Sequence, residues 1–167
     1  TYGDSLHKDL EPIEKQLLEI INYTCKVKKG KVIIPAFSVG RTQEILYDLN
    51  QLELERRLPE LEYFVDSPLS MEATQIVKSY PEYFNKRIQK VLQTDNDPFH
   101  FNGLKYVKTV EESKLLNFRN GPCVIISASG MATGGRVLHH LANHVGNHRN
   151  MVILTGFQSP GTRGATL

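Results

Sequence analysis

The 167-residue chain has little of what marks a secreted, membrane or disordered protein. It has only two cysteines, Cys25 and Cys123, and no signal-peptide pattern, so no disulfide framework is expected. Both lie in apolar or helical patterns typical of small buried side chains in a reducing cytosol. No apolar run approaches the ~20 residues of a membrane span. The sequence therefore predicts a cytoplasmic protein without a membrane partner.

Net charge is also small, with 20 basic against 18 acidic residues and a formal value of +2. There is no polybasic tail, so any binding to nucleic acid must depend on locally clustered charge. Average composition without repeats or low-complexity segments argues against disorder and against solenoids. A chain of this length forms one domain that buries roughly 70% of its unfolded surface.

Apolar runs alternate with amphipathic segments along the chain. Strands are expected at 31–36, 63–65, 104–107, 123–127 and 151–155, and helices at 13–25, 40–57, 69–79, 81–92, 110–118 and 135–145. This alternation predicts βαβ units in a three-layer α/β/α fold, with a doubly wound, mainly parallel sheet of Rossmann-like type. The polar stretch 93–103 is either a ligand-reaching loop or only a connection.

Three of the apolar runs end at a turn that carries serine, glycine and arginine. The turns are Ser38–Arg41, Ser129–Arg136 and Ser159–Arg163. Glycine lets backbone N–H groups approach an anion, a following helix N-terminus adds positive potential, and arginine binds phosphate oxygens in a planar fork. Three such turns at one sheet edge suit a polymer with several phosphates better than a single nucleotide.

Other readings of these residues remain open. The Ser129–Arg136 turn lacks the lysine of a P-loop and has no ribose-binding acid downstream, and its glycines could serve packing alone. Asp66 is expected to cap the helix that starts near Leu69 rather than to act as a general base. A metal site at His139, His140, His144 and His148 is disfavoured, because no further ligand completes it; solvated or phosphate-facing side chains are expected instead. The tyrosines are assigned to core or interface.

Five blocks of sequence, in order, resemble a known family. They are Thr1-Tyr2-Gly3 with His7, Ile34–Glu44, Val65–Leu69, Ser127–Met131 with Gly134–Arg136, and Gly156–Gln158 with Gly161-Thr162. The chain is similar throughout to the β-CASP region of metallo-β-lactamase-fold ribonucleases. That resemblance implies a nucleic-acid-clamping lobe inserted into a domain that cuts RNA at a two-zinc site.

The resemblance also implies what lies outside the chain. The zinc-binding motifs of that family have no counterpart here, and the acidic residue that precedes Thr-Tyr-Gly in the family is missing. We therefore expect residues 1–167 to be a single β-CASP domain from a longer enzyme, with the metallo-β-lactamase domain flanking it on both sides. The fragment alone should bind no zinc and have no nuclease activity.

The expected role is to bind and position RNA, with single-stranded DNA as an alternative ligand. Candidate contacts are Ser38, Gly40, Arg41, Thr42, Asp66, Ser67, Ser129, Gly130, Gly135, Arg136, Gln158, Thr162 and Arg163. Two other functions stay open: a self-sufficient Rossmann-like enzyme acting on a nucleotide or sugar phosphate, and a protein-docking module. The first would need its own acid, base or metal ligands, and the second an exposed apolar patch.

Overall fold

A computed structural model describes residues 13–167, and the statements below concern those residues. The resemblance at Thr1, Tyr2, Gly3 and His7 lies outside this range. None of the described helices is both long and apolar enough to cross a membrane.

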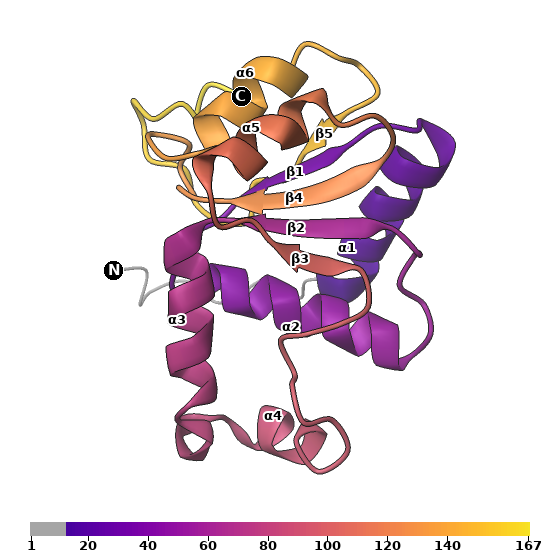
Figure 1. Cartoon of the computed structure of the whole chain (residues 1–167), viewed down its shortest axis with the longest axis vertical. Coiled ribbons are helices and arrows are strands. Elements are labelled where there is room, and N and C mark those ends of the chain that lie inside the picture. Colours follow the sequence, from indigo (N-terminus) through magenta and orange to yellow (C-terminus); the bar gives the residue numbers. More distant parts are fainter. Residues whose placement is uncertain (1–12) are drawn as a thin grey trace, which may run out of the picture.

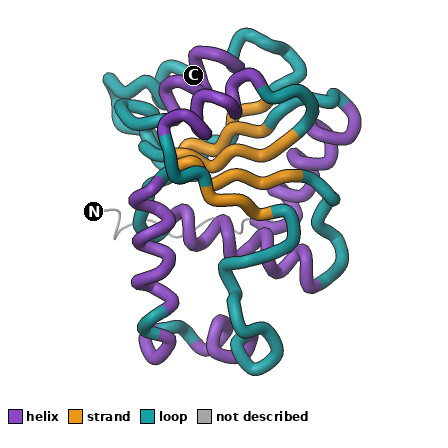
Figure 2. The backbone as a smooth tube through the Cα atoms, in the orientation of Figure 1, coloured by secondary structure: helices purple, strands orange, loops and turns teal. Residues whose placement is uncertain are grey.

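Five parallel strands form one sheet in the order β3-β2-β4-β1-β5 (Figures 1 and 2). The strands are β1 (Val32–Pro35), β2 (Glu62–Asp66), β3 (Leu104–Tyr106), β4 (Cys123–Ser127) and β5 (Met151–Val152). The helices are α1 (Ile13–Ile21), which continues as the π-helix η1 (Asn22–Val27), then α2 (Arg41–Leu54), α3 (Pro68–Lys78), the 3-10 turn η2 (Pro81–Tyr83), α4 (Lys86–Val91), α5 (Val110–Phe118) and α6 (Val137–His144).

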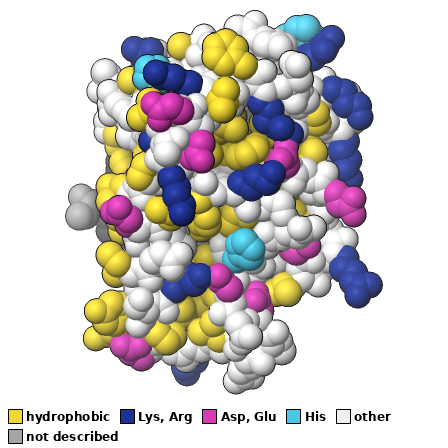
Figure 3. Space-filling model, viewed as in Figure 1, with side chains coloured by type: hydrophobic (Ala, Val, Ile, Leu, Met, Phe, Trp, Pro, Cys, Tyr) yellow, Lys and Arg dark blue, Asp and Glu magenta, His cyan; other side chains and the backbone are white. Residues whose placement is uncertain are grey.

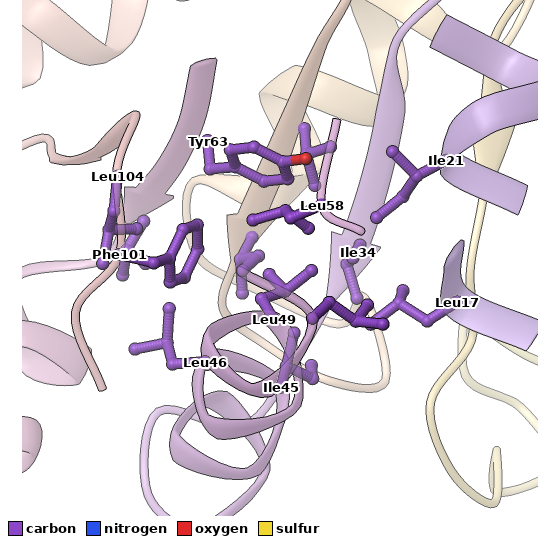
Figure 4. Packing of buried hydrophobic residues seen from close by; sticks show 14 of the residues in the cluster. Leu17, Ile21, Ile34, Ile45, Leu46, Leu49, Leu58, Tyr63, Phe101 and Leu104 are labelled. Atoms are coloured by element: carbon purple, nitrogen blue, oxygen red, sulfur yellow. The ribbon is translucent and has the colours of Figure 1, made fainter. Parts of the chain in front are cut away.

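Successive residues of the strands point to opposite faces of the sheet and belong to two different apolar layers. Ile34 of β1 packs with Leu17 and Ile21 of α1 and with Leu46 of α2 (Figure 4). Its neighbour Ile33 packs in a separate cluster that holds Val137 and Leu141 of α6.

On β4, Ile126 joins the cluster of α1 and α2, while Ile125 packs with Leu116 of α5. Helices α1 and α2 thus cover one face of the sheet and α5 and α6 the other, which confirms the predicted three-layer α/β/α fold. Both cysteines are buried and neither forms a disulfide.

Several expected elements are shorter in the structure, and two of them have a clear local reason. β5 ends at Val152, and its neighbour β1 ends at Pro35, which has no N–H to offer the next rung. Helix α6 begins at Val137 rather than at Gly135, because Gly135 has a left-handed φ of 80°.

The segment 93–103 is a packed connection. Phe99 and Phe101 are buried in the main core, Asn50 donates to Asp95 over 2.6 Å, and Lys78 pairs with Asp97. These contacts favour the connecting role over a ligand-reaching loop.

Candidate functional site

The carboxyl ends of the parallel strands meet at one edge, on the left in Figure 1. The predicted polar turns leave the sheet here, and two of them touch. Ser38 Oγ, after β1, lies 3.2 Å from Ser67 Oγ, after β2. Ser127 Oγ at the end of β4 donates to the backbone oxygen of Asp66 over 2.9 Å, so three adjacent strands are tied together at this edge.

Ser67, not Asp66, caps helix α3. The Ser67 hydroxyl accepts a hydrogen bond from the Ser70 backbone N–H at 3.1 Å, with Pro68 in the first turn. The expectation that Asp66 is the cap is therefore wrong. Asp66 is the last residue of β2, and its side chain points into the layer between the sheet and helices α5 and α6 instead of toward the start of α3.

Asp66 is fully buried and its carboxylate is saturated by donors. Oδ1 accepts from Arg136 Nη1 at 2.7 Å, while Oδ2 lies 2.5 Å from Ser113 Oγ and 2.6 Å from His140 Nε2. Burial alone would raise the pKa of Asp66, but the hydrogen bonds from His140, Ser113 and Arg136 outweigh it and lower this pKa below its ordinary value. We call Asp66, Ser113, Arg136 and His140 the Asp66 network.

His140 has a structural environment that the sequence did not reveal. Its ring is fully buried, and its Nδ1 lies 3.0 Å from Asn117 Oδ1 of α5 while Nε2 faces Asp66. The expectation of a solvated or phosphate-facing side chain is thus wrong for His140. The partners Ser113 and Asn117 are spaced one helical turn apart on α5, but nothing in the sequence pairs them with a histidine on α6.

His144 lies one turn further along α6 and is also buried. Its ring is stacked on that of His140, with centroids 6.5 Å apart, and its Nε2 has no partner among the described groups. Burial, together with the positive charge of Lys31, lowers the pKa of His144 to about 4. Within residues 13–167, no three histidine, cysteine or acidic side chains converge as metal ligands would.

Arg136 belongs to the fold rather than to an open crevice. Besides Asp66, its guanidinium donates to the carbonyl oxygens of Val107 at 3.2 Å and Lys108 at 3.0 Å. Arg41 begins α2 on the opposite face of the sheet and pairs with Glu44 at 2.7 Å. The prediction that Arg41 and Arg136 offer free guanidinium groups to one crevice is therefore corrected; a contact of either with RNA stays a prediction.

The turn after β4 is held by hydrogen bonds to the side chain of its own serine, Ser129. Ser129 Oγ accepts from the backbone N–H groups of Thr133 at 3.2 Å and Gly134 at 3.3 Å, so these two amides are already used. A Cβ on Gly135 would lie 2.3 Å from the Ala128 carbonyl oxygen, which shows that this glycine is required for close packing. The packing interpretation of the glycines thus holds at Gly135.

The turn after β1 is held by Gln43, a residue outside the predicted set of contacts. Gln43 Oε1 accepts from the Gly40 N–H at 2.7 Å, and Nε2 donates to Thr74 Oγ1 of α3 at 2.8 Å. Thr42 is buried and donates its hydroxyl to the Phe37 carbonyl oxygen at 2.8 Å, so this candidate contact is turned inward. The available signal was a glutamine three residues after Gly40, at the helix position from which a capping-box side chain reaches the N-cap N–H.

The remaining candidates lie in the last segment of the chain. Gln158 Nε2 donates to the Gly130 carbonyl oxygen at 3.2 Å, which ties this segment to the turn after β4. Thr162 donates to the Ser159 carbonyl oxygen at 2.7 Å, while the side chain of Arg163 is exposed. No aspartate or glutamate occurs after Glu112, so β4, α6, β5 and their turns carry only neutral and basic side chains.

An apolar groove of about 740 Å³ lies apart from the Asp66 network. It is lined by α1, α2, α3, α4 and the segment after β5, including Leu17, Ile45 and Phe84, with Arg41 and Asp48 among its polar residues. Burial, and repulsion from Glu14, raise the pKa of Asp48 to about 6. This groove is where the docking alternative would apply.

Comparison with known proteins gives one family. The profile of the Beta-Casp domain matches residues 42–167. Among curated proteins, the chain is 37% identical over its whole length to "Ribonuclease TTHA0252" of Thermus thermophilus, and 37% identical to an "RNase J-like protein" of Methanocaldococcus jannaschii. It is 34% identical, over 98% of its length, to "Transcription termination factor FttA" of the same archaeon.

The chain spans only part of each of these relatives. It corresponds to 38% of the ribonuclease and of the RNase J-like protein, and to 26% of the termination factor.

Proposed function

The chain belongs to the β-CASP family, and from this membership we propose that it is the RNA-binding lobe of a longer, zinc-dependent cytoplasmic ribonuclease. In this proposal the metallo-β-lactamase domain of the same polypeptide flanks the lobe and performs the hydrolysis. The lobe contributes binding and positioning of the RNA backbone. Curated relatives named as ribonuclease, RNase J-like protein and termination factor support an RNA partner.

The observation that carries the proposal is the sheet edge at which three polar turns gather. Ser38 and Ser67 are in contact at 3.2 Å, and the turn after β4 lies on the strand between them. Serine hydroxyls at such an edge can bind phosphate oxygens without reading bases. Arg163 is an exposed cation in the last segment of the chain, which contains no acidic residue, and Arg41 begins the helix that follows Ser38.

The residues described here do not fit zinc. His140 has both ring nitrogens in hydrogen bonds, to Asp66 and Asn117, and burial together with the positive charge of Lys31 lowers the pKa of His144 to about 4. A zinc ion needs three or four converging nitrogen, sulfur or carboxylate ligands. We therefore propose that the metal ligands of the enzyme are supplied outside this chain, and we assign no step of hydrolysis to its side chains.

The proposal is tested in the full-length protein with Arg41→Ala/Arg163→Ala. Arg136 is left intact because its loss would leave the buried Asp66 carboxylate without one of its donors. Each lost phosphate contact lowers the slope of log affinity against log salt by about 0.7, so the double variant should lose about 1.4. Zinc content should be unchanged, and Lys86→Ala/Lys90→Ala on α4 is the charge-matched control. An unchanged slope for RNA, or an equal loss in the control, contradicts the assignment; single-stranded DNA in parallel tests the alternative ligand.

A further inference from the structure

A second group of cations lies at the opposite, amino-terminal edge of the sheet. Lys26, Lys28 and Lys29 come from η1 and the turn that leads into β1, and Arg149 comes from the turn that leads into β5. We call these four residues the basic edge. In Figure 3, dark blue side chains predominate along the upper right of the molecule, over the segments that Figure 1 shows entering these two strands.

Strand pairing fixes the two turns against each other. β1 and β5 are neighbours, the Lys31 N–H donates to Asn150 Oδ1 at 2.8 Å, and the Met151 N–H donates to the Lys31 carbonyl oxygen at 2.9 Å. A Cβ on Gly30 would lie 2.0 Å from the Arg149 carbonyl oxygen, so the backbones are in direct contact there. Cations distant in sequence are thereby held on one surface.

Local hydrogen bonds hold each turn in shape. The Gly30 N–H donates to the Thr24 carbonyl oxygen at 2.9 Å, and the Lys28 ammonium lies 5.9 Å from the centre of the Tyr23 ring, which is itself exposed. In the other turn the Arg149 N–H donates to Asn147 Oδ1 at 3.0 Å. Holding the cations in place reduces the entropy that binding would otherwise cost.

The charge of the basic edge is not neutralised by the fold. Among residues 13–167, Lys26, Lys28, Lys29 and Arg149 form no ion pair with a carboxylate. Neither turn contains an acidic residue, and Glu19 of α1 is the acid nearest to Lys26 along the chain.

Acids do lie at the other end of this edge. Glu53, Glu60 and Glu62 lie around the start of β2, and Glu62, its first residue, pairs with Lys105 and Arg119. β4 separates β2 from β1, so the two regions are about 10 Å apart at 4.8 Å per strand, roughly one Debye length at physiological salt. The positive potential over β1 and β5 therefore persists.

We propose that the basic edge is a second binding surface for the phosphate backbone of RNA, distinct from the turns at the carboxyl edge. The inference rests on the proposed function, because it takes RNA to be the ligand of this lobe. It implies that long RNA makes contacts that a short RNA held at the carboxyl edge cannot reach. Tyr23 gives this surface a ring on which a base can stack.

Two RNA lengths separate the surfaces. A 5-mer held at the carboxyl edge is too short to contact the whole of the basic edge as well, whereas a 30-mer is six times longer and can contact both edges. In the full-length protein, Lys28→Gln/Lys29→Gln/Arg149→Gln should leave binding of the 5-mer unchanged. For the 30-mer, three lost contacts should reduce the salt slope by about 2 and weaken binding up to about 100-fold at 0.1 M salt.

Controls keep the outcomes distinct. Lys86→Gln, Lys90→Gln and Lys114→Gln remove the same charge from other exposed helix positions, and should change binding of the 30-mer by no more than about threefold. Thermal melting confirms that both variants fold. Equal 30-mer binding by the wild type and the basic-edge variant, or equal loss in the control, overturns the proposal. If neither RNA binds the wild-type protein, the proposed function itself fails.

Discussion

Replacing Asp66 by asparagine tests the buried network that fixes the turn after β4. The carboxylate has no exposed surface and accepts from three side chains on three different elements. Breaking a buried ion pair by removing one partner costs about 3–5 kcal/mol, because the remaining charge stays buried. Asparagine keeps one oxygen that can still accept from Arg136, so we expect a loss at the lower end, about 3 kcal/mol.

Urea unfolding followed by circular dichroism measures this loss. Asp97→Asn is the matched control, because Asp97 pairs with Lys78 with both side chains about one-third exposed (30% and 33%). A pair of that exposure contributes about 0–1 kcal/mol. If Asp66→Asn costs no more than Asp97→Asn, the Asp66 network does not stabilise the fold as its geometry indicates.

The cost should also depend on pH in a defined direction. The pKa of Asp66 is lowered in the folded protein, despite its burial, by hydrogen bonds from His140, Ser113 and Arg136. Its stabilising contribution is therefore complete above the unfolded pKa of about 4 and is lost as the pH falls through the lower, folded value. The difference between wild type and Asp66→Asn should be constant from pH 5 to 7 and should shrink below pH 4.

The remaining predictions concern other parts of the chain. Gly135→Ala should lower the free energy of unfolding in urea by about 2–4 kcal/mol, because φ is 80° and the new Cβ would meet the Ala128 carbonyl oxygen. Gly134→Ala, where a Cβ meets nothing within 4 Å, should change this free energy by no more than about 0.5 kcal/mol. Equal effects of the two substitutions would contradict the packing role of Gly135. Asp48→Asn should stabilise the protein by about 1 kcal/mol at pH 7 and by little at pH 4, because burial raises the pKa of Asp48 to about 6 and makes its ionisation above that pH unfavourable. The urea midpoints of wild type and variant at both pH values measure this gain in stability. A larger gain at pH 4 than at pH 7 would refute the prediction. His144→Phe should keep a ring stacked on His140 and should reduce the loss of stability between pH 6.5 and 4. Burial lowers the pKa of His144 to about 4, so in this pH range the wild-type side chain takes up a proton when the protein unfolds. An unaltered pH profile of the melting temperature would contradict this prediction. The purified chain should contain no stoichiometric zinc by elemental analysis, and one zinc per chain would require a site that the described residues do not show.

The sequence predicted the layers well because the apolar periodicity is strong. Val124, Ile125 and Ile126 form an apolar run typical of a strand buried on both faces, and α5 and β4 have the predicted bounds. The ends of elements were harder. Pro35 terminates the pairing of β5 through a neighbouring strand, and no window of residues around Val152 contains that information.

The site was predicted at the level of the sheet edge and not of individual side chains. Ser38 and Ser67 do meet, because the carboxyl ends of parallel strands always share an edge. Arg136 and Thr42 were interpreted as ligand contacts because their turns resemble phosphate-binding turns, yet both satisfy groups of the protein itself. An arginine or threonine beside glycine has the same sequence signature whether it faces phosphate or the fold.

What separates these cases is the balance of buried charge, which depends on tertiary contacts. Asp66 at the end of a central strand cannot be left without donors, since an isolated buried carboxylate would be far too costly. With β2 placed between β3 and β4, the donors come from α5, from the turn after β4 and from α6, as Ser113, Arg136 and His140 respectively. Arginine in such a turn is therefore free for a ligand only where no buried acid competes for it. Arg163, on a segment without acids, meets that condition, which is why the RNA-binding test relies on it and on Arg41, whose partner Glu44 is exposed and holds it weakly.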